Sequence, residues 1–137
     1  MGYRSEVSYI IRFEKPEERE AFIGVQLCKK NGIINEVLKE LTKLEDTKLF
    51  FYANDVKWYD GYPDVKSHHD LMNEAVEMFD DAGFMFYRIG EEMDDIDVQS
   101  EGDYDELWDY LSVHRSIDID IDTSKLIPIL NEEGELA

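Results

Sequence analysis

The pattern of apolar and polar residues predicts four strands along the first 89 residues of this chain, two of them by strict alternation. In residues 4–13 the apolar side chains recur at every second position, which places them on one face of an extended segment. Residues 47–53 and 56–59 predict two further strands, separated by an Asn-Asp turn signal, and therefore a hairpin. Residues 84–89 alternate again and predict the fourth strand.

Three other segments show helical periodicity. Residues 16–30 begin with a proline and two glutamates, which suit a first helical turn, and end before an Asn-Gly stop. Residues 33–44 and 64–82 carry apolar side chains at helical spacing and predict two more helices. The expected apolar stripe of the first helix consists of Phe22, Val25, Leu27 and Cys28.

The order of these elements predicts an α+β fold of ferredoxin-like type, in which helices cover one face of an antiparallel sheet. Residues 91–122 follow as an acidic extension. Within it we expect a loop to about residue 102, a helical turn near residues 105–111 and an added acidic strand at residues 113–121. The chain is therefore predicted to form a single domain over residues 1–130, with a frayed tail over residues 131–137.

The net charge of −19 is concentrated in the second half of the chain. Residues 1–66 carry twelve acidic and eleven basic side chains, whereas residues 67–137 carry twenty-one acidic and three basic ones. Such a field repels nucleic acid and anionic membranes, and it speeds encounter with basic surfaces. We therefore expect a basic protein as partner, with no direct binding of nucleic acid or membrane.

Some features of the sequence bear on the cellular compartment of the protein. No apolar run reaches the roughly 18 residues of a membrane span, and no signal-peptide pattern opens the chain. A single cysteine, Cys28, excludes an intramolecular disulfide and fits a reducing environment. Its place beside Leu27 on the first helix predicts a buried thiol. These features predict a soluble cytoplasmic protein.

Within the acidic extension, aspartates alternate with isoleucines. We call Asp118, Asp120 and Asp122 the aspartate row. In a strand, such side chains share one face at a spacing of about 6.8 Å. This spacing is close to the distance between every second phosphate along one strand of B-DNA. The row could therefore imitate nucleic acid, and the alternative is an ordinary solvated surface.

Other acids of residues 91–122 would extend this surface, and an aromatic pair lies among them. The candidate partner-binding residues are Asp94, Asp95, Asp97, Asp103, Asp105, Glu106, Trp108, Asp109, Asp118, Asp120 and Asp122. Trp108 and Tyr110 add the aromatic surface that commonly anchors an interface, while charge steers the encounter. A second aromatic cluster, Trp58, Tyr59 and Tyr62, is either a hairpin end packed on the third helix or a recognition patch.

No arrangement of residues predicts a catalytic, cofactor or metal site. A calcium loop starting at Asp118 would have Thr123 at its sixth position and Ile129 at its twelfth, where glycine and glutamate are required. His68 and His69 diverge by about 100° on a helix, so they are interpreted as helix-surface residues rather than joint ligands. His114 and Cys28 have no apparent chemical partner. We therefore expect a non-enzymatic protein without a cofactor.

Three stretches of the chain resemble small acidic proteins encoded by bacteriophages and prophages. They are Met1-Gly-Tyr-Arg-Ser-Glu-Val7, Val56-Lys-Trp-Tyr-Asp-Gly-Tyr-Pro-Asp-Val65 and Tyr87-Arg-Ile-Gly-Glu91. The resemblance supplies no activity and no catalytic residues. It implies a phage accessory protein in the bacterial cytoplasm, and acidic phage proteins of this size are often inhibitors of host nucleic-acid-handling systems.

These expectations combine into one functional hypothesis and one alternative. The hypothesis is a non-enzymatic anti-defence or host-takeover inhibitor, whose acidic half binds the basic nucleic-acid-binding surface of a host protein as a nucleic-acid mimic. Restriction, CRISPR, nuclease or transcription machinery would be plausible targets. The alternative is a structural or adaptor module that binds through the aromatic surface around Trp58, with the charge serving only solubility.

Overall fold

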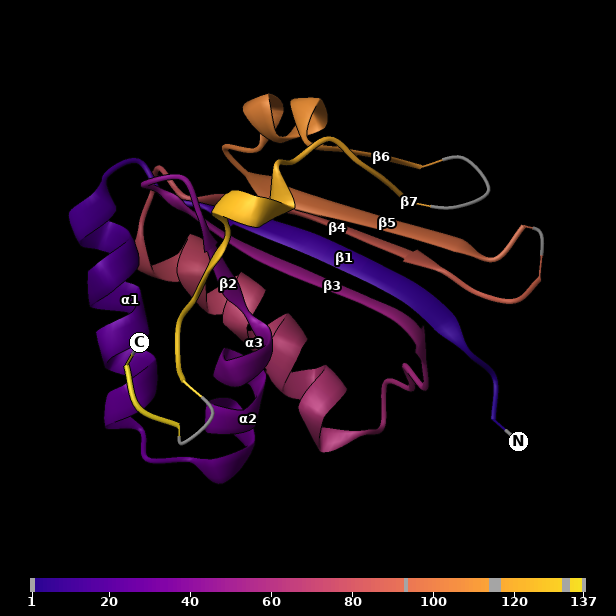
Figure 1. The fold of residues 1–137 in the computed structure, drawn as a ribbon, viewed down its shortest axis with the longest axis horizontal. Helices are drawn as coiled ribbons and strands as arrows, with labels where there is room; N and C mark the ends of the chain where they lie inside the picture. The colour runs from indigo at the N-terminus through magenta and orange to yellow at the C-terminus, as the bar shows by residue number, and fades with distance from the viewer. Residues whose placement is uncertain (1, 93, 114–116, 132–133, 137) are drawn as a thin grey trace.

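The computed structural model describes residues 2–92, 94–113, 117–131 and 134–136, which form an α+β fold on a six-stranded antiparallel sheet (Figure 1). The strands of this sheet are β1 (Ser5–Arg12), β2 (Thr42–Leu44), β3 (Lys48–Val56), β4 (Gly83–Ile89), β5 (Ile96–Gly102) and β8 (Ile127–Pro128). Across the sheet they lie in the order β5-β4-β1-β3-β2-β8. β6 (Leu111–Val113) and β7 (Ile117–Ile119) pair with each other in a separate two-stranded sheet.

In the described part of the chain, three α-helices pack on one face of the large sheet (Figure 1). They are α1 (Pro16–Cys28), α2 (Gly32–Glu40) and α3 (Pro63–Met78). The central strands lie in the order β4-β1-β3-β2, with α1 and α2 between β1 and β2 and with α3 between β3 and β4. This is the split βαβ arrangement of the ferredoxin-like fold, so the predicted fold class is confirmed.

The opposite face of the sheet is covered by the C-terminal segment. Figure 1 shows the orange part of this segment, with β6 and β7, on the side of the sheet away from the helices, whereas the yellow end of the chain passes β2 to the helix side, where Ile129 and Leu130 join the helix-side cluster. The described residues of the C-terminal segment form two short 3-10 helices, η1 (Asp105–Asp109) and η2 (Thr123–Lys125), together with β6 and β7. Leu107, Leu111 and Ile117 from this segment are buried in a second apolar cluster with residues of the sheet. β1 is therefore buried on both of its faces, because Tyr9 lies in the helix-side cluster and Ile10 in the second.

The hairpin expected at Asn54-Asp55 is not formed. β3 continues through both residues, and its pairing with β1 shifts register at this point. Asp55 adopts a left-handed φ of 57°, so the turn signal marks a β-bulge rather than a reversal. The hairpin lies instead between β2 and β3, where Glu45 has a left-handed φ of 55° in the intervening turn.

The second and third helices are shorter than predicted. α2 ends at Glu40, and Leu44 lies on β2 rather than at the end of the helix. The reason is that Leu44 packs in the second cluster, whereas Val37 and Leu38 pack on the helix side, and no single helix can contact both faces of a sheet. α3 ends at Met78 instead of residue 82, and Ala82 lies in the turn before β4.

The apolar stripe predicted for α1 is only partly correct. Its buried residues are Arg19, Phe22, Ile23 and Gln26. Val25 is 39% exposed and Cys28 is exposed, so the predicted buried thiol is wrong. The helix is rotated from the expected orientation because Arg19 turns inward, where its guanidinium donates hydrogen bonds to two carbonyl oxygens at the start of β3 and in the preceding turn.

The acidic extension differs from the prediction in two places. The expected loop to residue 102 contains β5, whose alternation of Ile96 and Val98 with acidic and amide side chains is a strand pattern. The expected strand over residues 113–121 is replaced by β6 and β7. His114 and Arg115 lie outside the described residues. None of the described helices is long and apolar enough to cross a membrane.

Candidate interface for a basic partner

Asp95, one of the predicted partner-binding acids, is held by the fold. Its carboxylate accepts hydrogen bonds from the Arg88 guanidinium at 2.8 and 3.2 Å and from the Tyr3 hydroxyl at 2.6 Å. The Arg88 bonds first, and the Tyr3 bond second, hold the pKa of Asp95 below its usual range. Asp97 is half-buried on β5, opposite Arg88 in the pairing with β4. Asp95 therefore joins the N-terminal segment to the turn between β4 and β5.

Asp103 and Glu106 are also engaged inside the molecule. The Arg12 guanidinium donates to Asp103 at 2.8 Å and to Glu106 at 3.0 Å, and the Lys48 ammonium lies 3.1 Å from Glu106. Burial tends to raise the pKa of Glu106, but the hydrogen bonds and charges of Lys48 and Arg12 outweigh it and lower that pKa. These two acids attach η1, and the residues that lead into it, to the end of β1 and the start of β3.

Within the aspartate row, the alternation of burial is as the pattern predicted, but the strand is shorter. Ile117 is buried, and Asp118 and Asp120 are exposed. β7 ends at Ile119, so regular strand spacing does not extend along the whole row. Asp122 has a structural role, because its carboxylate accepts hydrogen bonds from the backbone N–H and hydroxyl of Ser124 at the start of η2.

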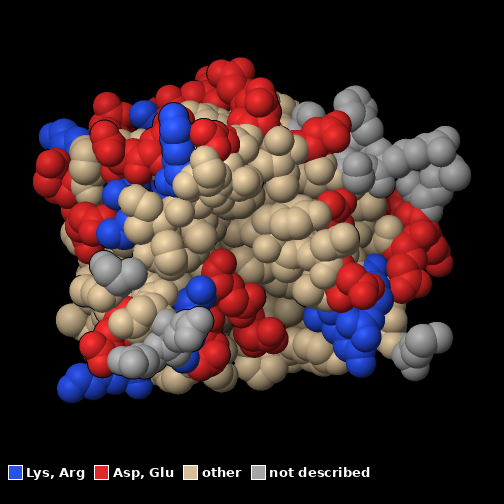
Figure 2. All heavy atoms as spheres, viewed as in Figure 1, with Lys and Arg blue, Asp and Glu red and all other residues tan. Residues whose placement is uncertain are grey.

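The remaining predicted acids face solvent. Asp94, Asp105, Asp109 and Asp120 are exposed, and no described residue forms an ion pair with them. Asp105 and Asp109 lie on η1. This helix forms the upper margin of the molecule in Figure 1, and Figure 2, drawn from the same side, shows acidic atoms gathered along that margin. Exposed carboxylates without an internal partner keep their full charge available for a partner protein.

Trp108 is exposed beside these acids, as the sequence suggested. Its side chain is 56% exposed, whereas its neighbour Leu107 is fully buried in the second cluster. Leu107 fixes the orientation of η1, and the next side chain along this short helix must then point outward. A hydrogen bond of 2.8 Å from Asp120 N–H to the Tyr110 carbonyl ties the end of η1 to the segment after β7.

These contacts form a shallow cavity of about 290 Å³, which we call the Trp108 hollow. Its lining residues are Trp108, Asp109, Tyr110, Leu111, Asp118, Ile119 and Asp120. An indole ring and carboxylates in one hollow suit a lysine or arginine side chain, since the ring face and the acids both attract a cation. The structure therefore brings together residues of η1 and of the segment around β7 that lie up to twelve positions apart in the sequence.

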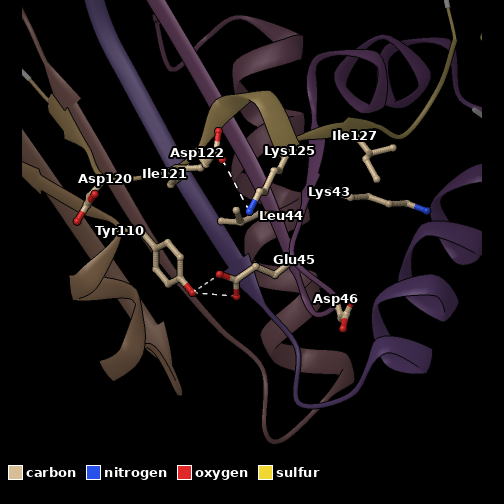
Figure 3. Close-up of a pocket in the computed structure, with 10 residues that line it drawn as sticks. All are labelled: Lys43, Leu44, Glu45, Asp46, Tyr110, Asp120, Ile121, Asp122, Lys125 and Ile127. Atoms are coloured by element: carbon tan, nitrogen blue, oxygen red, sulfur yellow. Dashed lines mark hydrogen bonds and ion pairs between the residues drawn. The ribbon is translucent and has the colours of Figure 1, made fainter.

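A larger cavity of about 450 Å³, the Tyr110 hollow, lies between the C-terminal segment and the turn after β2 (Figure 3). The Tyr110 hydroxyl donates to both carboxylate oxygens of Glu45, at 2.8 and 2.9 Å. This hydrogen bond, followed by that from Lys48, lowers the pKa of Glu45 against the opposing effect of burial. Tyr110 and Asp120 line both hollows. The sequence contains no local signal for this contact, because Glu45 and Tyr110 are 65 residues apart.

His68 is buried, contrary to the predicted surface position. Only 1% of it is exposed, and its Nδ1 is hydrogen-bonded to the Tyr9 hydroxyl at 2.6 Å. Its ring packs against Phe51 and Trp58, with centroids 4.5 and 5.0 Å away. Burial, with a smaller contribution from His69, lowers the pKa of His68 to about 3. His68 is therefore a neutral core residue at physiological pH, and Trp58 packs with it against the helix-side cluster.

The chemistry of the site favours recognition of positive charge. In the described part of the chain, no three histidine, cysteine, aspartate or glutamate side chains are placed to share a metal ion. The two hollows combine exposed carboxylates with aromatic and aliphatic surface, a combination typical of sites for basic side chains. Comparison with models of known families, with curated proteins and with solved structures gave no match to this chain.

Proposed function

We propose that this protein is a non-enzymatic interaction protein whose acidic C-terminal surface occupies the basic nucleic-acid-binding surface of a host protein. The observation that carries the proposal is the Trp108 hollow, in which a 56% exposed indole lies beside Asp109 and Asp120. The carboxylates steer a basic partner into contact, and the indole adds a contact surface that desolvates and retains it.

A nucleic-acid-binding surface fits this chemistry because it presents arginine and lysine side chains spaced to contact phosphates. The same guanidinium groups form charge-assisted hydrogen bonds with carboxylates. The acids of this protein come from η1, from β7 and from the residues after it, rather than from one long strand. The likeness to nucleic acid therefore lies in the density of negative charge and not in a regular ladder of carboxylates.

The test starts with capture from bacterial lysate on the immobilised protein at low salt, followed by identification of the retained proteins by mass spectrometry. We expect a nucleic-acid-binding protein that elutes with rising salt and is displaced by a DNA or RNA duplex. The affinity of that purified partner is then measured for the wild type and for the double variant Asp109→Asn with Asp120→Asn. Asp122 is left unchanged because it caps η2.

A matched control removes the same charge elsewhere. Glu77→Gln with Asp80→Asn neutralises two exposed acids at the end of α3, on the helix side of the sheet. Loss of two exposed charge pairs at the hollow should weaken binding on the order of tenfold, and the control should leave it nearly unchanged. Equal weakening by both double variants, or a partner indifferent to duplex and salt, would contradict the proposal and favour the adaptor hypothesis.

A further inference from the structure

β5 forms one margin of the large sheet, and no strand of the described chain lies beyond it. It is seven residues long and pairs with β4 along its whole length. An edge strand of this kind presents unpaired backbone N–H and C=O groups, which can bind a further strand. Natural proteins commonly protect such an edge with charged side chains, proline, a bulge or a covering loop. β5 contains no proline and no register shift, and its charged side chains are Asp97 and Glu101.

The pairing with β4 determines which backbone groups point outward. Gly90 N–H donates to the Asp95 carbonyl at 2.8 Å, and Asp103 N–H donates to the Ala82 carbonyl at 3.1 Å. Directly opposed residues of an antiparallel pair alternate between bonded and non-bonded. Positions 95, 97, 99, 101 and 103 therefore bond toward β4. The N–H and C=O groups of Val98 and Ser100 consequently point away from the sheet.

The two faces of β5 differ in chemistry. Ile96 and Val98, 41% and 49% exposed, lie on the face covered by the C-terminal segment, since Val98 pairs with Tyr87 of the second cluster. Asp97 and Glu101 lie on the helix-side face, where Glu101 pairs with Phe84. A strand added to this edge would thus meet apolar side chains on one face and carboxylates on the other.

A second copy of this chain is a poor occupant of the edge. If two β5 strands paired antiparallel about Gln99, Asp97 of each copy would lie opposite Glu101 of the other, and like charges directly opposed are destabilising. Each copy also carries a net charge of −19. The acids of β5 therefore oppose self-pairing while they attract a basic strand.

We propose that the outer edge of β5 binds an extended segment of a basic protein by strand addition. The segment would alternate lysine or arginine, placed opposite Asp97 and Glu101, with apolar residues opposite Ile96 and Val98. Asp97 and Glu101 would form non-hydrogen-bonded pairs with the new strand, and side chains approach most closely in such pairs. This inference goes beyond the proposed function, because it concerns a different surface and a different mode of recognition.

The probe is a capped synthetic peptide of sequence Lys-Val-Thr-Val-Lys-Val, and a peptide of the same composition with the two lysines adjacent is its control. In the free protein, we expect rapid hydrogen exchange at the Val98 and Ser100 amides and slow exchange at Gln99, which bonds toward β4. Saturating alternating peptide should slow exchange at Val98 and Ser100 on the order of tenfold, and the control peptide should not.

A second arm changes the affinity without changing the backbone of the protein. Asp97→Asn with Glu101→Gln should weaken peptide binding on the order of tenfold, whereas the charge-matched Asp109→Asn with Asp120→Asn should leave it unchanged. N-methylation of the central valine, which removes the donor facing Val98, should weaken binding by a similar factor while the protein stays wild type. Because Asp109 and Asp120 belong to the Trp108 hollow, either proposal can fail without the other.

Three results would overturn the inference. The first is equal binding of both peptides, or binding that leaves exchange at Val98 and Ser100 unchanged. The second is slow exchange at these two amides in the dilute free protein, which would mean that this chain already covers the edge. The third is protection that grows with protein concentration in the absence of peptide, which would identify a second copy as the occupant.

Discussion

The two faces of the central sheet are covered in different ways. On the helix face, nineteen buried residues of the described chain form one apolar cluster. On the other face, the corresponding cluster has eight buried residues, and Leu107, Leu111 and Ile117 of the acidic segment are among them. The same segment carries exposed acids, so one short stretch of chain provides both apolar cover and a negatively charged surface.

This difference shows how a fold can carry a high charge of one sign. Along residues 117–122 the isoleucines turn toward the second cluster and the aspartates toward solvent, so burial and charge are separated within one segment. Beneath the segment, Arg12 and Lys48 neutralise Asp103 and Glu106. The helix face depends on apolar packing, whereas the second face depends on fewer apolar contacts and on ion pairs.

The largest predicted effect compares apolar packing on the two faces. Phe51→Ala should lower the free energy of unfolding by about 3–5 kcal/mol, because Phe51 is 2% exposed and packs against Tyr9 and His68. Leu111→Ala, in the smaller cluster, should lower it by about 2 kcal/mol, since the C-terminal segment can shift to fill the space. Urea denaturation measures both, and Val25→Ala, at an exposed position of α1, is the control. A larger loss for Leu111→Ala would show that the acidic segment is part of the main core.

The next prediction concerns pH and tests the helix face alone. Because the pKa of His68 is lowered to about 3 by burial, the unfolded chain binds this proton more readily than the folded protein. The contribution of the neutral, buried His68 ring to the free energy of unfolding is complete above pH 6.5. It is lost as the pH falls from 6.5 toward 3, at about 1.4 kcal/mol per pH unit. The expected loss between pH 6.5 and 4.5 is therefore roughly 2–3 kcal/mol.

His68→Gln isolates this contribution. The ring faces the Tyr9 hydroxyl, Glu40 and His69, and the pKa of Glu40 is raised by burial, which acts in the opposite direction. The difference in unfolding free energy between wild type and His68→Gln cancels the contributions of these neighbours to first order. Chemical denaturation at several pH values between 4.5 and 7.5 should show a flatter profile for the variant. Parallel profiles would mean that His68 titrates normally and is not buried as described.

The smallest predicted effect tests the ion pairs of the second face. Arg12→Met should lower the free energy of unfolding by about 1–2 kcal/mol, because it leaves Glu14, Asp103 and Glu106 without their shared guanidinium. The loss should be larger at low salt, where the three carboxylates repel one another more strongly. Lys125→Met removes the same charge from a side chain that is 83% exposed, and should change stability by less than about 0.5 kcal/mol. Equal effects would show that only the net charge matters.

The local patterns of the sequence predicted most elements of the fold, and the errors have physical causes. β1, β4 and α1 followed from periodicity and stop signals, and the bulge at Asp55 was mistaken for a turn because both use a left-handed residue. The acidic side chains of β5 are typical of a solvated loop, although the alternation of Ile96 and Val98 with polar residues is a strand pattern. His68 was placed on the surface because a sequence does not reveal a buried partner such as the Tyr9 hydroxyl, 59 residues away.

By itself, the sequence determined the α+β class, the excess of negative charge in the second half and the alternation of isoleucine with aspartate, since these depend on composition and local spacing. Only the tertiary structure decided which acids are exposed. Arg12 pairs with Glu106 across 94 residues, and the Tyr110 hydroxyl donates a hydrogen bond to Glu45 across 65, so the partners of these two acids depend on contacts that no local pattern encodes. The sheet topology also decided that β5 lies at an edge. An edge strand has a neighbouring strand on one side only, and this depends on the order of the strands in the sheet rather than on any local pattern.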